Sequence, residues 1–174
     1  MKDVLREYRI DFSGLAPGTY TYRYRIGQEL FDHFGYSDGW TDAQADVTAT
    51  LTKRQNVMEL SLSCQGTVLT HCDMTGVEFR LPVEGSEELV VKQGDEFRED
   101  DDIITLPREE PSINIARYVY ELFVLNVPQK RYHPDYLSGK LQAPALHSSA
   151  DENPGGDGQD PIDPRWAKLK DIKS

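Results

Sequence analysis

A chain of 174 residues can form a single domain with a tail. Its hydrophobic content of 38% is enough for a core but lies below the usual globular share, so we expect part of the chain to contribute nothing to packing. The formal net charge of -11 repels phosphate backbones and argues against tight, autonomous nucleic-acid binding. The same charge suits a basic protein partner.

Cysteine content and hydropathy exclude several further classes of protein. Two cysteines supply neither a disulfide framework nor a closed set of four zinc ligands. The first residues, MKDVLREYRIDF, lack the apolar centre of a secretory signal, and no run approaches the roughly 18 apolar residues that span a membrane. We therefore expect a soluble, cytoplasmic protein with no membrane partner.

In chain order, alternating apolar and polar residues predict a series of strands. The clearest alternation places Tyr20, Tyr22 and Tyr24 on one face of a strand and Arg23 and Arg25 on the other. Core packing of the tyrosines then leaves the two arginines in solvent. The pattern predicts strands at residues 8–12, 19–26, 43–51, 58–64, 77–83, 89–91 and 103–106, with a short helical or irregular bridge at 28–34.

The stretch from 58 to 83 reads as two strands folded back on each other, and we expect the sheet to be built outward from it. The turn between the strands, at residues 71–76, contains Cys72. Gly66 interrupts the first strand and predicts a bulge or bend, after which the alternation can change face. Residues 84–102 hold nine acidic residues against Lys92 and Arg98, and we expect the acidic run at 99–102 to be a solvated loop.

One long helix is predicted, at residues 112–126, and Pro128 ends it. Arg117 and Glu121 fall four residues apart and can form an ion pair, while the other faces are apolar or tyrosine, so we expect the helix to be largely enclosed. Together these elements predict an α+β fold. Its sheet is expected to be mostly antiparallel and strongly curved, open or barrel-like, and packed by this one main helix.

The composition of the chain changes after residue 137. Residues 138–162 are rich in Ser, Gly, Asp, Asn and Pro, which predicts a disordered linker after a domain at 1–137. Asp163 and Pro164 are a good helix start, so residues 163–174 are expected to form a short, basic helical motif. Trp166 lies within it and is either a partner-binding residue or a contact with the chain's own domain.

Two groups of side chains are candidates for function. The first joins exposed basic residues and the tail tryptophan as contacts with a partner or RNA: Arg23, Arg25, Arg165, Trp166, Lys168 and Lys170. The second is Cys72 with His71, which leaves open a metal- or thiol-dependent enzyme. Neighbouring residues of a strand point to opposite faces, however, and a zinc site needs further ligands. No phosphate loop, nucleophile elbow or cofactor fingerprint occurs, so we expect no catalysis, no cofactor and no small-molecule substrate.

Several short motifs, in their order, resemble the large ribosomal RNA subunit accumulation protein family, also called YceD-like. They are residues 18–34, Gly66-Thr67-Val68 followed by Cys72-Asp73, Tyr120-Glu121 leading to 125–128 and His133, and Asp163-Pro164-Arg165-Trp166 with 167–169. Many relatives carry Cys-Asp-Arg-Cys at the hairpin, whereas this chain has Thr75 in place of the second cysteine. A paired-thiol or metal role of relatives therefore does not transfer to this chain.

The resemblance implies a bacterial protein needed for accumulation of large-subunit ribosomal RNA, encoded near a ribosomal protein gene. It also marks Cys72, Asp73, Asp163 and Pro164 as family-motif residues. We expect a non-catalytic ribosome biogenesis factor that binds a ribosomal protein or a pre-ribosomal large subunit. Two alternatives stay open: a module that binds ribosomal RNA directly, and the enzyme or metal protein centred on Cys72.

Overall fold

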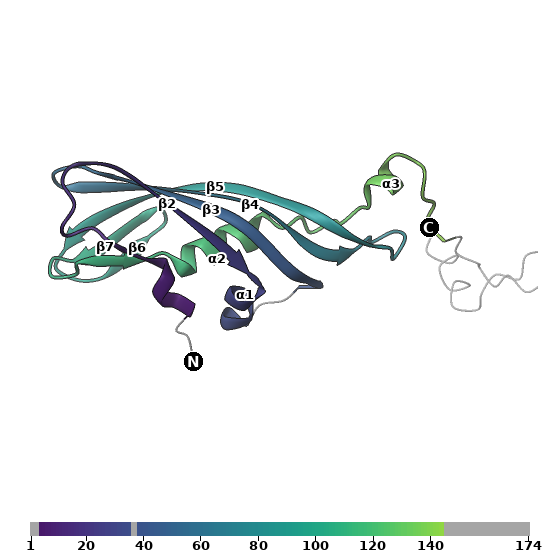
Figure 1. Cartoon of the computed structure of the whole chain (residues 1–174), viewed down its shortest axis with the longest axis horizontal. Helices are drawn as coiled ribbons and strands as arrows, with labels where there is room; N and C mark the ends of the chain where they lie inside the picture. The colour runs from purple at the N-terminus through teal and green to yellow at the C-terminus, as the bar shows by residue number, and fades with distance from the viewer. Residues whose placement is uncertain (1–3, 36–37, 145–174) are drawn as a thin grey trace, which may run out of the picture. The chain divides into compact units, whose positions relative to one another are not determined.

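The computed structural model describes residues 4–35 and 38–144 (Figure 1). The predicted linker beyond 144 and the tail motif at 163–174 lie outside the described residues. The helical elements are η1 (Val4–Tyr8, a 3-10 helix), α1 (Gln28–Phe34), α2 (Ala116–Asn126) and α3 (Pro134–Leu137). The strands are β1 (Arg9–Asp11), β2 (Gly18–Gly27), β3 (Trp40–Lys53), β4 (Val57–His71), β5 (Glu78–Gly94), β6 (Arg98–Asp100), β7 (Ile103–Pro107) and β8 (Ser112–Asn114).

Six of the strands form one sheet in the order β2-β3-β4-β5-β7-β6. All neighbouring pairs are antiparallel except β5 and β7, which are parallel. β1 and β8 pair separately. The α+β, β-rich, mostly antiparallel prediction is confirmed. The barrel-like alternative is wrong, because the sheet does not close and leaves β2 and β6 at its edges.

The predicted hairpin is the centre of the sheet. β4 and β5 pair from Val57 with Lys92 to His71 with Glu78. The turn is closed by the Cys72 N–H, which donates to the Val77 carbonyl at 2.9 Å, and the Gly76 N–H, which donates to the Cys72 carbonyl at 2.8 Å. β5 is longer than predicted, because the strands expected at 77–83 and 89–91 are one continuous strand. The two parts join through Gly85, which has no Cβ and faces the Asn126 side chain of α2.

Gly66 does not form the predicted bulge. It pairs with Ala45 and Val83 in unbroken register, and the alternation keeps its face, since Cys64 and Val68 on either side are both buried. The register shift lies instead in β3, between Thr41 and Gln44. Gly66 is needed for another reason. A Cβ there would collide with the Gln44 carbonyl and with Ala45, so the glycine lets the two backbones approach closely.

α2 lies along one face of the sheet (Figure 1) and contacts β4 and β5. It begins at residue 116 and not at 112, because Ser112–Asn114 is drawn into a ladder with β1 and the Asn114 Oδ1 accepts a hydrogen bond from the Ala116 N–H at 3.0 Å. The helix is also less enclosed than predicted, since Leu125 is 82% exposed. The predicted pair of Arg117 and Glu121 is confirmed at 2.7 Å.

The core fills the space between the sheet and the helices. Phe31 of α1 packs edge-on against Trp40 at a ring separation of 5.2 Å and against Phe123 of α2 at 4.9 Å. All three side chains are buried, as are the apolar residues of β3, β4 and β5 that face them. Burying such side chains stabilises the fold by about 1.5–3 kcal/mol each. None of the helices in the described part of the chain is long and apolar enough to cross a membrane.

The acidic run at 99–102 is not simply a solvated loop. Arg98–Asp100 forms β6, a short hairpin with β7 whose tight turn holds Asp101 at a φ of 45°. The short apolar strand predicted at 103–106 is confirmed as β7.

Candidate functional site

The sheet has one face turned away from α2, and this face carries mostly polar side chains. We call this surface the open face. Cross-strand register arranges it in rows, of which the central one runs from Arg23 through Thr48 and Ser63 to Ser86. The polar residues of the open face on β2 to β5 include Thr19, Thr21, Arg23, Arg25, Gln44, Asp46, Thr48, Thr50, Thr52, Glu59, Ser61, Ser63, Gln65, Thr67, Glu78, Arg80, Glu84, Ser86, Glu88 and Lys92.

Arg23 and Arg25 both lie on the open face, at the β2 edge. The Arg25 Nε lies 3.2 Å from the Asp46 Oδ1, and both side chains are exposed. Arg23 forms no ion pair with any described residue. The predicted separation of arginines from tyrosines is confirmed, because Tyr22 and Tyr24 pack against the core on the opposite face.

Tyr24 shows how firmly that opposite face is packed. Its ring stacks on Tyr8 at 5.5 Å. Burial, with smaller contributions from the neighbouring Tyr22 and Tyr8, raises the pKa of Tyr24 to about 12. The tyrosine row is therefore part of the core face and not a solvent-facing stacking platform, and only the arginines of β2 are presented on the open face.

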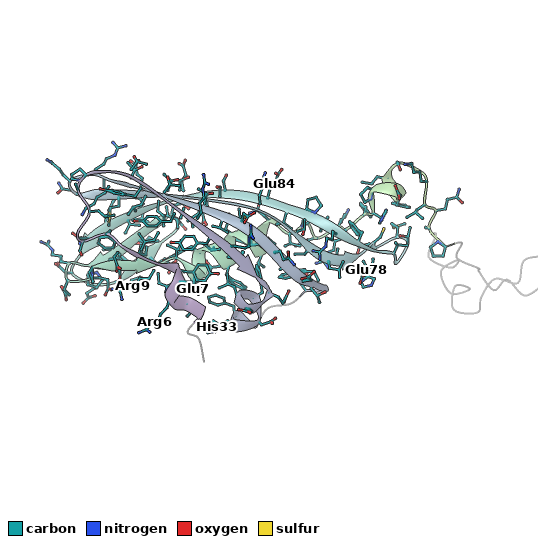
Figure 2. All side chains as sticks on the ribbon, viewed as in Figure 1. Arg6, Glu7, Arg9, His33, Glu78 and Glu84 are labelled. Atoms are coloured by element: carbon teal, nitrogen blue, oxygen red, sulfur yellow. The ribbon has the colours of Figure 1, made fainter. Side chains whose placement is uncertain are left out.

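The charge of the open face changes across the sheet. Its half on β4 and β5, which we call the acidic half, carries Glu59, Glu78, Glu84 and Glu88 against two basic side chains, Arg80 and Lys92, and Arg80 is ion-paired with Asp42. Figure 2 shows Glu84 on the side of the sheet away from α2. The Glu59 Oε2 lies 3.1 Å from the Arg54 Nη2, with both side chains at least half exposed, so that pair is screened by solvent.

Small side chains make the middle of the open face concave. A hollow of about 520 Å³ lies over Thr48, Ser63 and Ser86 and is bordered by Asp46 and Glu84. A second hollow of about 570 Å³ lies beside it over Arg23 and Arg25, and the two share Asp46 and Thr48. The hydroxyl rows thus leave a shallow trough from the basic edge of β2 to the acidic half. Such a surface can hold a polar partner through hydrogen bonds and charge.

Cys72 is not part of the open face. It is buried in the hairpin turn, with 2% of its surface exposed. Burial raises the pKa of its thiol. Hydrogen bonds from the His133 backbone, from the Thr75 hydroxyl and from the backbone at Met74 and Thr75 outweigh that effect and lower the pKa to about 7. Sequence reasoning missed this arrangement, because the donors come from the turn itself and from a segment about sixty residues away.

Asp73 holds the segment after α2 against the hairpin. Its Oδ2 accepts a hydrogen bond from the Arg131 N–H at 2.7 Å, and its own N–H donates to the Arg131 carbonyl at 2.8 Å. The Arg131 guanidinium reaches the Gly39 carbonyl at 3.2 Å and the Asp38 Oδ2 at 3.2 Å. The family-motif residues Cys72 and Asp73 therefore fasten the chain at 131–133 to the hairpin turn. Arg131 carried no signal in the sequence that marked it for this contact.

The metal or thiol hypothesis gains no partner from this geometry. His71 is exposed while Cys72 is buried, as expected for neighbouring residues at the end of a strand. The His133 Nδ1 accepts a hydrogen bond from the Asp135 N–H at 3.0 Å. Within residues 4–35 and 38–144, no three His, Cys, Asp or Glu side chains come close enough together to hold a metal ion.

The remaining predicted site residues belong to the C-terminal tail. Asp163, Pro164, Arg165, Trp166, Lys168 and Lys170 lie outside the described residues, so their predicted roles stay predictions.

Comparison with known proteins gives one finding. The family model described as "Large ribosomal RNA subunit accumulation protein YceD" matches residues 60–173. The match covers more than half of the 174 residues, and it includes the hairpin, α2 and the tail motif. Residues 18–34, which we also assigned to the resemblance, lie outside it. Neither the curated proteins nor the solved structures contain a match.

Proposed function

This chain belongs to the YceD family of large ribosomal RNA subunit accumulation proteins, and from that premise we propose that it is a non-catalytic factor of ribosome biogenesis. In this proposal it supports accumulation of the large-subunit ribosomal RNA by binding a ribosomal protein or a pre-ribosomal particle. Work of this kind takes place in the bacterial cytoplasm. The tail motif with Trp166 is proposed as a second contact with the same particle.

The observation that supports this proposal most directly is the acidic half of the open face. Glu59, Glu84 and Glu88 are exposed on adjacent strands, and no described element covers them. A protein that itself binds ribosomal RNA carries Lys and Arg to neutralise phosphates, and those side chains complement an acidic surface. The overall net charge of -11 favours the same kind of partner.

Co-purification tests the proposal with matched charge changes. Tagged full-length protein is captured from lysate at low and at moderate salt, and enrichment of large-subunit proteins and RNA is measured. We expect enrichment that falls with salt and is reduced by Glu84→Gln with Glu88→Gln. The control, Glu96→Gln with Glu109→Gln, makes the same net change on exposed residues away from the open face. Absence of large-subunit components at low salt would rule the proposal out.

Direct contact with ribosomal RNA is a second candidate, favoured by one observation. Arg23 and Arg25 project from the same face of β2 into one hollow, where they can reach successive phosphates. Arg165, Lys168 and Lys170 of the tail are proposed to add to this contact. A gel-shift with large-subunit ribosomal RNA should then show affinity that falls with salt and with Arg23→Ala and Arg25→Ala. Affinity that ignores both changes would contradict it.

A further inference from the structure

β2 is a long strand with one unpaired edge. It runs for ten residues, Gly18–Gly27, and every one of them is in register with β3. In the described part of the chain, β2 pairs with no strand other than β3, and no other backbone hydrogen bond reaches it. The outer edge of β2 therefore presents N–H and C=O groups at regular spacing and without protein partners.

Proteins commonly protect such an edge, and the two edges of this sheet differ in that respect. β6, at the other edge, is three residues long, which leaves little backbone for another chain to pair with. β2 contains no proline, and its pairing with β3 contains no register shift. The structure thus leaves one edge regular enough to accept an additional strand.

The side chains that flank this edge define what the additional strand must carry. On the open face they are Thr19, Thr21, Arg23 and Arg25, of which Arg25 also pairs with the exposed Asp46. On the core face they are Tyr20, Tyr22, Tyr24 and Ile26, and Tyr22 and Tyr24 are half-buried. Residues directly opposite on neighbouring antiparallel strands lie close enough for opposite charges to attract and for apolar side chains to pack. A strand with carboxylates at every second position and apolar residues between them matches both faces.

A second copy of this chain fits the edge poorly. Antiparallel pairing of two β2 strands around a two-fold axis brings both pairs of Arg23 and Arg25 together on one face, where like charges repel. With the axis at Tyr24, each Arg23 lies opposite the other copy's Arg25.

RNA fits the edge poorly as well. Phosphates can accept hydrogen bonds from the N–H groups and pair with the arginines, but the carbonyl groups that alternate with the N–H groups need donors at strand spacing. A polypeptide backbone supplies donors and acceptors in that alternation.

We infer that β2 accepts an extended, acidic segment of a partner protein as a seventh strand of the sheet, with carboxylates facing Arg23 and Arg25. Residues 18–27 lie outside the family-matched segment, so this inference does not rest on the proposed function. It predicts a partner different from the basic one proposed for the acidic half of the open face.

A peptide titration tests the inference with the full-length protein. The probe is a fluorescent peptide of alternating glutamate and valine, followed by anisotropy. Two further versions of the peptide are N-methylated on alternate amides. In one version the methyl groups replace the N–H groups on the edge that would pair with β2, and in the other they replace the N–H groups on the edge that faces solvent. Strand addition requires that one version binds like the parent peptide and that the other fails. A peptide of the same composition with its glutamates grouped at one end should bind more weakly.

Variants and amide exchange locate the site. Arg23→Glu with Arg25→Glu should weaken binding about tenfold, since two cross-strand pairs become repulsive. Arg9→Glu with Arg54→Glu, which reverses two exposed arginines outside β2, should change it less than twofold. Bound peptide should slow hydrogen exchange of amides in residues 18–27. Circular dichroism confirms that each variant is folded.

Several results would overturn the inference. These are equal binding of both N-methylated peptides, an unchanged affinity after the double reversal at 23 and 25, or unaltered exchange in residues 18–27. Protection of those amides by an RNA oligonucleotide but not by the peptide would assign the edge to RNA. Protection that rises with protein concentration alone, together with a dimer in sedimentation, would assign it to a second copy.

Discussion

Replacing Gly66 by alanine tests the packing on which the hairpin depends. An alanine Cβ at this position meets the Gln44 carbonyl oxygen, the Ala45 Cβ and, at 2.7 Å, the Ala45 Cα. Two of these three atoms belong to the backbone of β3, which is held between β2 and β4. The neighbouring strand cannot yield by rotating a side chain, so we expect the added methyl group to push the strands apart.

The expected cost follows from two opposing effects. Overpacking a tightly filled site costs about 1–3 kcal/mol, and more where backbone must move. Replacing glycine by alanine in a strand recovers about 0.5–1 kcal/mol of conformational entropy. We therefore expect Gly66→Ala to lower the free energy of unfolding by about 2 kcal/mol, with a fall in Tm of about 6–8 °C.

Urea unfolding followed by circular dichroism measures this difference, and Gly27→Ala is the matched control. Gly27 is the N-cap of α1, with a φ of -129°, and an added Cβ meets nothing within 4 Å. Alanine is less favourable than glycine at an N-cap by about 0.5–1 kcal/mol, but it recovers about as much conformational entropy, so the replacement should change stability by no more than about 0.5 kcal/mol. A Gly66→Ala protein as stable as the wild type would show that β3 can move to admit the methyl group, against this prediction. An equal loss in both variants would also contradict it.

Three further predictions concern the hairpin turn and its surroundings. Arg131→Ala should lower the free energy of unfolding by about 2 kcal/mol, because the Arg131 side chain is 11% exposed and hydrogen-bonded to several groups. Arg9→Ala, at an exposed arginine, should lower it by less than about 0.5 kcal/mol. Equal losses in urea unfolding would contradict this. The Cys72 thiol has a pKa of about 7 in the folded protein against 9.0 ordinarily, so the stability it adds as thiolate is full above pH 9 and is lost as the pH falls through 7. Ultraviolet thiolate absorbance should therefore titrate near pH 7. This titration should vanish in Cys72→Ser and persist in Cys64→Ser, because burial raises the pKa of the Cys64 thiol in the wild-type protein. A titration near pH 7 that survives Cys72→Ser would disprove the prediction. Burial, and then the charges of Asp102 and Glu121, raise the pKa of Glu87, so its negative charge opposes folding at neutral pH. Glu87→Gln should therefore stabilise the protein at neutral pH by up to about 1 kcal/mol. This advantage should be lost as the pH falls through the pKa of Glu87. Thermal unfolding at pH 7 and pH 4 measures this, and a destabilised Glu87→Gln would contradict it.

The strands could be predicted where both faces of the sheet have a consistent character. Met58, Leu60 and Leu62 alternate with polar residues because α2 covers one side of β4 and the open face is polar. The same logic placed Arg23 and Arg25 opposite the tyrosines. Period-2 alternation is a local property, so it survives in the sequence without knowledge of the partner strand.

The features that the sequence did not reveal depend on contacts between distant segments. Ser112–Asn114 reads as the start of a helix, but it pairs with β1 more than a hundred residues earlier. The sheet does not close into a barrel, because β7 adds to β5 in parallel and the pairing ends at β6. Neither feature leaves a local pattern in the sequence. Gly66 is visible as a glycine, but only the position of β3 shows whether it bends the strand or admits a neighbour.

The candidate site divides in the same way. The exposed arginines of β2 could be found from alternation alone. The acidic stretch from residue 84 could be found from charge, but the strand was predicted to end at 83, so its place on the open face was not predicted. The nest of donors around Cys72, and the role of Arg131 in joining Asp73 to Asp38, required the fold, since they join the hairpin turn to the chain after α2.

The most direct test of the central claim is the cellular ratio of large-subunit to small-subunit ribosomal RNA. We expect that removing this protein lowers the ratio and that the wild-type chain restores it. We also expect that Glu84→Gln with Glu88→Gln restores the ratio only partly, whereas Glu96→Gln with Glu109→Gln restores it fully. A ratio that does not change when the protein is removed would contradict the role in ribosomal RNA accumulation. Full restoration by both double variants would contradict the part assigned to the acidic half of the open face.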